Sequence, residues 1–136
     1  MRILFILSFF LGSYSMLYSA DSVTNVRTSF NNGKQRIVMD IDGDNEPAYY
    51  VRKGRNVIDI TIERTISMDK AKTFAELLGN TNFIKKASFI VLPDEKETII
   101  SLSIGDKVSD DIFALAKPSR LVIDLEKTKP IKEGKE

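Results

Sequence analysis

Apolar and polar residues alternate along several short segments of the chain, and this period of two predicts half-buried β-strands. The clearest segments are residues 35–42, 56–63, 97–105 and 120–126. Their apolar faces consist of Ile37, Met39 and Ile41; Ile58, Ile60 and Ile62; Ile100, Leu102 and Ile104; and Leu121, Ile123 and Leu125. Further strands are predicted over residues 23–30, 48–52, 83–92 and 112–116. Turn residues such as Asn32-Gly33 separate the strands.

The period becomes helical between Ser67 and Gly79. The apolar residues that fall on one helical face are Met68, Ala71, Phe74, Ala75 and Leu78. Ser67 is a suitable N-cap, and Asp69 lies in the first turn, where the helix dipole favours a negative charge. Gly79 is a common helix end. The sequence therefore predicts one helix of about three turns between two groups of strands.

The two groups of strands resemble each other. Residues 37–41 correspond to residues 100–104 at an offset of 63, and residues 58–60 correspond to residues 123–125 at an offset of 65. We therefore predict a mainly β fold produced by internal duplication. In this fold two similar four-stranded sheets, joined by one short α-helix, pack face to face as a sandwich.

The first twenty residues have a different character. Arg2 is the only charged residue before Asp21, and it precedes an uninterrupted apolar run over residues 3–7 that continues to Leu11 after Ser8. A basic start, a short apolar stretch and a small-residue exit are typical of a secretory signal peptide. We expect cleavage near Ala20, and an uncleaved N-terminal membrane anchor is the alternative interpretation.

The predicted organisation is thus a signal peptide over residues 1–20, a β domain over residues 21–127 and a charged, disordered tail over residues 128–136. Removal of the signal peptide takes away Arg2 and no acidic residue, so 19 basic and 19 acidic residues remain. A neutral chain with mixed charges is not typical of a protein that binds nucleic acid or an anionic membrane.

The chain contains no His, Cys or Trp. The usual zinc-hydrolase sites and the Ser-His-Asp and Cys-His nucleophilic arrangements therefore cannot be built. The glycines stand singly at turns and form no phosphate-binding loop. Acidic residues are plentiful, but Asp40, Asp59 and Asp124 recur on strands in a way that favours a structural role. We expect no enzyme activity, no cofactor and no metal.

Two strand segments, Arg36-Ile37-Val38-Met39-Asp40 and Arg120-Leu121-Val122-Ile123-Asp124, share the order arginine, three aliphatic residues, aspartate. We call them the Arg–Asp cassettes. The second follows a proline turn, Pro118-Ser119, and residues 56–60 form a weaker copy. Together with the opening Val23-Thr24-Asn25-Val26-Arg27, these segments resemble the AMIN domain (amidase N-terminal domain) family over residues 23–126. The chain departs from the family pattern at Gly54-Arg55, where a Pro-x-Arg sequence usually closes the first half.

The resemblance implies a symmetric pair of four-stranded sheets and a non-catalytic role in the bacterial periplasm. AMIN domains occur fused to cell-wall amidases and outer-membrane secretins, which they localise by binding peptidoglycan. We therefore expect a standalone, exported family member that binds peptidoglycan and localises to the cell wall. The alternative function, from a different class, is a protein–protein adaptor that docks onto a separate envelope machine or cell-wall hydrolase.

Arginines are the first candidates for ligand binding, because a guanidinium group suits forked recognition of the carboxylates in peptidoglycan peptides. Arg36 and Arg120 are the first choices, since they hold matching cassette positions in the two halves. Second choices are Arg27, Arg52 and Arg55. An alternative interpretation makes the cassettes a solvated face with ion pairs between neighbouring strands. Arg and Asp four residues apart on one strand lie roughly 13 Å apart and cannot pair directly.

Two adjacent tyrosines, Tyr49 and Tyr50, are further candidates. Neighbouring residues on a strand face opposite sides, so we expect one tyrosine in the core and the other exposed. An exposed tyrosine either stacks on a sugar ring or covers the edge of the core.

Overall fold

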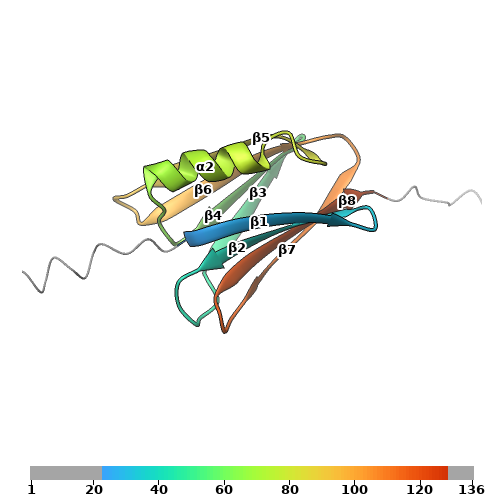
Figure 1. The fold of residues 1–136 in the computed structure, drawn as a ribbon. Coiled ribbons are helices and arrows are strands. Elements are labelled where there is room, and N and C mark those ends of the chain that lie inside the picture. Colours follow the sequence, from blue (N-terminus) through green and yellow to red (C-terminus); the bar gives the residue numbers. More distant parts are fainter. Residues whose placement is uncertain (1–22, 129–136) are drawn as a thin grey trace, which may run out of the picture.

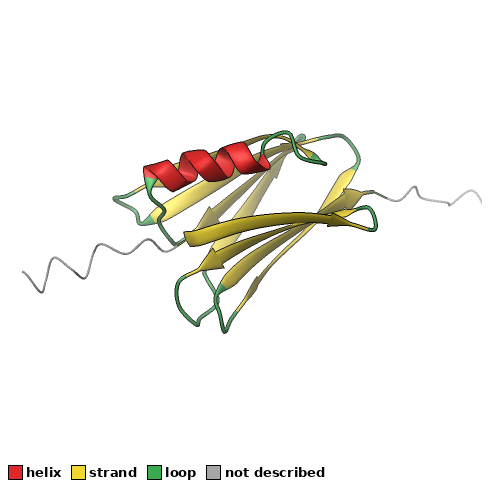
Figure 2. Ribbon diagram, in the orientation of Figure 1, coloured by secondary structure: helices red, strands yellow, loops and turns green. Residues whose placement is uncertain are grey.

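Eight antiparallel strands and one helix make up residues 23–128, the part of the chain that the computed structural model describes (Figures 1 and 2). The strands are β1 (Val23–Asn31), β2 (Lys34–Ile41), β3 (Tyr49–Gly54), β4 (Val57–Ile62), β5 (Ile84–Leu92), β6 (Glu97–Ile104), β7 (Val108–Leu115) and β8 (Arg120–Lys127), and the helix is α2 (Met68–Leu78). Every predicted element within these residues is present. Strand β7 begins at Val108, earlier than the predicted residue 112.

The strands form two four-stranded sheets, which confirms the predicted sandwich. Sheet A has the order β1-β2-β8-β7, and sheet B has the order β3-β4-β6-β5. Each sheet therefore combines one hairpin from the first half of the chain with one hairpin from the second half. When β1–β4 are matched in order with β5–β8, the order β1-β2-β8-β7 of sheet A converts to β5-β6-β4-β3. This is the order of sheet B read from its other edge. This shared topology is the one that two duplicated halves produce.

The strand register refines the predicted repeat. Ile37 pairs with Ile123 in sheet A, and Ile100, the counterpart of Ile37, pairs with Ile60 in sheet B. Ile123 therefore corresponds to Ile60 at an offset of 63, and the offset of 65 taken from the Ile-Asp pattern is wrong. Sequence similarity misplaced it because Asp59, which we aligned with Asp124, stands at a different position of the sheet.

The core lies between the two sheets. All twelve residues of the predicted apolar faces are at most 7% exposed. Helix α2 packs against β5, where the rings of Phe74 and Phe89 lie 6.1 Å apart between centroids. Ala71, Phe74 and Leu78 are buried as predicted, but Met68, the first residue of the helix, is 72% exposed.

The predicted helix ends are also observed. The Ser67 hydroxyl accepts a hydrogen bond from the Lys70 amide at 3.2 Å, and the Gly79 amide donates to the Ala75 carbonyl at 2.9 Å. Asn32 and Gly33 adopt positive φ angles of 53° and 77° in the β1–β2 turn, as the Asn-Gly pair predicts.

On the side away from α2, the sheets are joined through their edge strands β3 and β7. The Tyr49 hydroxyl donates to the Ile112 carbonyl at 3.1 Å, and Lys53 forms an ion pair with Asp110 at 3.0 Å. These contacts fix the position of one sheet relative to the other and leave both outer faces to solvent.

The predicted signal peptide and residues 129–136 of the predicted tail lie outside the described residues. Thr128, the first residue of that tail, donates its amide hydrogen to the Lys107 carbonyl. Within residues 23–128, no helix has the length and apolar character needed to cross a bilayer.

Candidate functional site on the outer face of sheet A

The two Arg–Asp cassettes lie side by side in the middle of sheet A, on the neighbouring strands β2 and β8. Because these strands are antiparallel, Arg36 stands opposite Asp124, and Asp40 stands opposite Arg120. The expectation that Arg36 and Arg120 hold matching places in the two halves is wrong, since the counterpart of β2 is β6. Their strands pair directly instead, which brings both arginines to one face.

Arg36 forms a two-pronged ion pair with Asp124. Its Nε and Nη2 atoms donate to the two carboxylate oxygens of Asp124 at 2.8 Å each. The Asp124 side chain is only 7% exposed, and Arg36 is half exposed above it. The hydrogen bonds from Arg36 keep the pKa of Asp124 below its ordinary value, although burial opposes this shift. The predicted pairing between neighbouring strands is therefore confirmed for this arginine.

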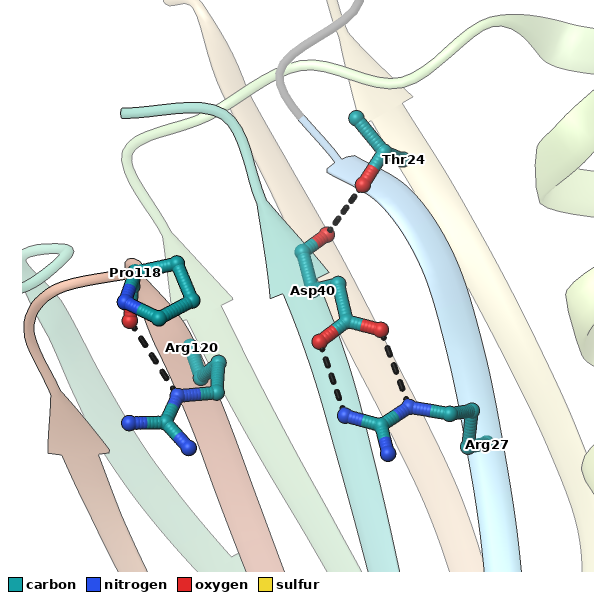
Figure 3. A network of polar contacts seen from close by, with 5 residues as sticks. All are labelled: Thr24, Arg27, Asp40, Pro118 and Arg120. Carbon is teal, nitrogen blue, oxygen red and sulfur yellow. Dashed lines mark hydrogen bonds and ion pairs between the residues drawn. The ribbon is translucent and has the colours of Figure 1, made fainter. Parts of the chain in front are cut away.

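Asp40 is paired with a different strand. Arg27 on β1 donates through Nε and Nη2 to the two carboxylate oxygens of Asp40, at 2.9 Å each (Figure 3). The Thr24 hydroxyl donates to the Asp40 carbonyl at 3.2 Å on the same strand pair. The carboxylate of Asp40 is thereby engaged by Arg27, although Arg120 stands opposite it in the register.

Arg120 consequently has no acidic partner among residues 23–128. Its Nε atom donates to the Pro118 carbonyl at 3.1 Å, and the rest of its guanidinium group lies on the far side of Asp40 from Arg27 (Figure 3). Of the three arginines on this face, only Arg120 forms no ion pair with another residue of the described part of the chain. It can accept a carboxylate without first losing an ion pair.

A hollow of about 480 Å³ lies among these three arginines. Its floor is apolar, because the row between the two charged rows of the sheet carries Val38, Val122 and Phe113 in register, with Leu115 at its border. Arg120 stands on one side of this apolar row and Arg36 on the other. The arrangement suits a ligand that joins an anionic group to small apolar groups.

A second hollow, of about 440 Å³, adjoins the first at Ser29 and Arg36 and continues to Lys34 and the β1–β2 turn. We call these two adjoining hollows, which lie beside β1 and β2, the groove. Two adjoining surface hollows suit a segment of an extended polymer better than an enclosed small molecule.

The remaining candidate residues lie elsewhere. Tyr50 and Arg52 are on the outer face of sheet B, where they line a separate hollow, and Arg55 is exposed in the β3–β4 turn. Tyr49 points inward and bonds to Ile112, and Tyr50 is 55% exposed, as expected for adjacent strand residues. Six of the seven candidates therefore divide between two opposite outer faces and a turn, and the seventh, Tyr49, points inward.

The sequence interpretation missed the apolar floor of the groove. Phe113 and Leu115 belong to β7, which was predicted as a short strand with no assigned face. Val38 and Val122 are the central residues of the cassettes, and their position between two charged residues was the available signal. Its meaning depended on the pairing of β2 with β8, which is a tertiary feature.

Within the described residues, no group of three or more acidic side chains is arranged to hold a metal ion. None of the known protein families matches the chain, and no curated protein matches it significantly. The site is therefore interpreted from its own geometry.

Proposed function

We propose that this protein is a non-catalytic module of the periplasm that binds peptidoglycan through the outer face of sheet A. The observation that carries the proposal is the guanidinium group of Arg120, which has no acidic partner in residues 23–128 and stands at the rim of an apolar-floored groove. The predicted export signal supports the proposed location, and the resemblance to AMIN domains supports the choice of polymer.

The chemistry of the wall peptides suits this groove. Peptidoglycan stem peptides carry carboxylates, which a guanidinium group binds by charge-assisted hydrogen bonds. They also carry small apolar side chains, for which Val38, Val122 and Phe113 offer a floor. An extended stem along β1 and β2 would bring its carboxylate to Arg120.

Co-sedimentation with purified peptidoglycan sacculi at low ionic strength tests the proposal. We expect the wild-type protein to sediment with the sacculi and Arg120→Ala to bind about tenfold more weakly or worse, since a hydrogen bond to a charged group contributes about 1.5–3 kcal/mol. Arg120→Lys should bind with intermediate strength, because it retains the charge and loses the fork.

Arg55→Ala is the matched control, because it removes one exposed positive charge from the β3–β4 turn. It should bind as the wild type does. Equal weakening by Arg55→Ala and Arg120→Ala would reduce the interaction to nonspecific charge attraction. Wild-type protein that stays in the supernatant would exclude peptidoglycan and leave the adaptor function, which capture of a separate envelope protein would then have to support.

A further inference from the structure

The outer face of sheet B contains an acidic residue, Asp59, that forms no ion pair within residues 23–128, unlike Asp40 and Asp124 of sheet A. Asp59 lies on β4 directly opposite Arg52 on β3. This is the same cross-strand relation that Arg36 has with Asp124. The described residues nevertheless contain no ion pair between Arg52 and Asp59.

The Asp59 Oδ1 atom is enclosed and accepts no hydrogen bond from the described residues. Buried acceptors without a partner are rare in folded proteins, because the lost hydration is not replaced. Asp59 also lines a hollow of about 110 Å³ whose other walls are Tyr50, Arg52, Thr61 and Ile99. A carboxylate and a guanidinium group that form no ion pair with each other, together with an apolar wall, therefore line one small space.

The size and chemistry of this hollow select a substituent rather than a whole ring. An acetamido group presents an N–H donor, a carbonyl acceptor and a methyl group on one rigid plane. The carboxylate of Asp59 can accept a hydrogen bond from the N–H group, and the guanidinium group of Arg52 can donate one to the carbonyl. The side chain of Ile99 can contact the methyl group. A free carboxylate is disfavoured because it would face the charge of Asp59.

The aromatic ring of Tyr50, beside the hollow, indicates what the rest of the ligand would be. Tyr50 is 55% exposed at the rim, and it lies in register with Thr61 and Ile99 across β3, β4 and β6. Its flat apolar face is available to the C–H face of a pyranose whose acetamido group enters the hollow.

We propose that this hollow is a second binding site, on the face opposite the groove, for an N-acetylated amino sugar. The choice of a sugar over a peptide amide rests on the proposed function, whereas the acetamido chemistry comes from Asp59, Arg52 and Ile99. One module would then contact stem peptides through sheet A and glycan through sheet B.

Titration of the ¹⁵N-labelled protein with N,N′-diacetylchitobiose, followed by NMR, tests this site. We expect saturable shifts at the amides of Tyr50, Asp59 and Ile99, without matching shifts around Arg120. Cellobiose, which has a hydroxyl in place of each acetamido group, should cause no saturable shift there. Asp59→Ala should weaken binding about tenfold or more, and Asp111→Ala on the outer face of sheet A should leave it unchanged.

Equal shifts from cellobiose, or no shift with either sugar, would overturn the proposal. Tighter binding of N-acetyl-alanine N-methylamide than of the disaccharide would overturn the choice of sugar and assign the hollow to a protein segment. Retained dispersion of the spectrum shows that each variant is folded. The disaccharide has no carboxylate, so a failure of this titration would not affect the sacculus experiment with Arg120→Ala. A failure of the sacculus experiment would likewise leave the result of this titration unaffected.

Discussion

Individual residues on sheet A differ in role although their types repeat. Arg27, Arg36 and Arg120 share one face. Aspartates bind the first two, whereas Arg120 has no acidic partner within residues 23–128. The difference depends on which strand reaches Asp40. Because β1 supplies Arg27 at that point, Arg120 forms no ion pair within residues 23–128.

The pair formed by Arg36 and Asp124 should contribute to stability. Arg36→Ala leaves the buried carboxylate of Asp124 without its partner, and we expect the free energy of unfolding to fall by about 1–3 kcal/mol. The measurement is urea denaturation of both proteins. Arg27→Ala is the control, since its pair is more exposed and should matter less. An equal loss in both variants would contradict the distinction between the two pairs.

The same pair predicts a dependence of stability on pH. The pKa of Asp124 is lowered by folding, so its contribution is complete above the ordinary value of 3.8 and is lost as the pH falls through the lower folded value. We expect the wild-type protein to lose stability below about pH 4, and Asp124→Asn to lose less over the same interval. Denaturation curves between pH 7 and pH 2 measure this difference. Parallel pH profiles would contradict it.

Buried polar residues were beyond the reach of the sequence pattern. Gln35 is fully buried, and its amide bonds to the hydroxyls of Thr28 and Thr81 and to the amide of Phe83. Gln35 is the first residue of the alternating segment and falls on the same face as Ile37, but its polar side chain was not assigned to the core. Thr28 of β1 and the segment before β5 together supply the partners that make its burial tolerable.

At the scale of elements, local signals were reliable where a side chain acts on its own segment. Ser67 caps α2, and Asn32-Gly33 forms the β1–β2 turn, as predicted. Strand β7 was predicted too short, because the charged Asp110 and Asp111 interrupt its apolar pattern. Asp110 is tolerated there because Lys53 of β3 pairs with it.

The cap of α2 can be tested directly. Ser67→Ala removes the acceptor for the Lys70 amide, and we expect a loss of about 1 kcal/mol in the free energy of unfolding. Ser67→Asp retains an acceptor and should remain close to the wild type. Thermal or urea denaturation of the three proteins measures the effect. Similar losses in Ser67→Ala and Ser67→Asp would mean that the hydroxyl has another role.

At the scale of the molecule, the decisive feature is the exchange of hairpins between halves. Neither half of the chain contains a complete sheet, because β1-β2 needs β8-β7 and β3-β4 needs β6-β5. The groove depends on this exchange, since its arginines and its apolar floor come from both halves.

This topology predicts that the halves do not fold separately. A fragment of residues 23–66 should give the circular dichroism spectrum of an unordered chain, because each of its hairpins lacks half a sheet. Addition of residues 67–128 should restore a strand spectrum. The fragment of residues 67–128 alone is the control. A cooperative thermal transition in residues 23–66 alone would contradict the coupling of the two halves.

The sequence by itself determined the elements, the twelve core positions of the four alternating segments and the single helix, because periodicity and capping act over a few residues. The sequence also indicated the arginines as candidates for ligand binding. Only the tertiary structure decided that β2 lies beside β8, that Asp40 binds Arg27, and that Arg120 and Asp59 remain without ionic partners within residues 23–128. The pairing of β2 with β8 joins residues at least 80 positions apart, and a period of two is equally satisfied by any neighbour with an apolar inner face.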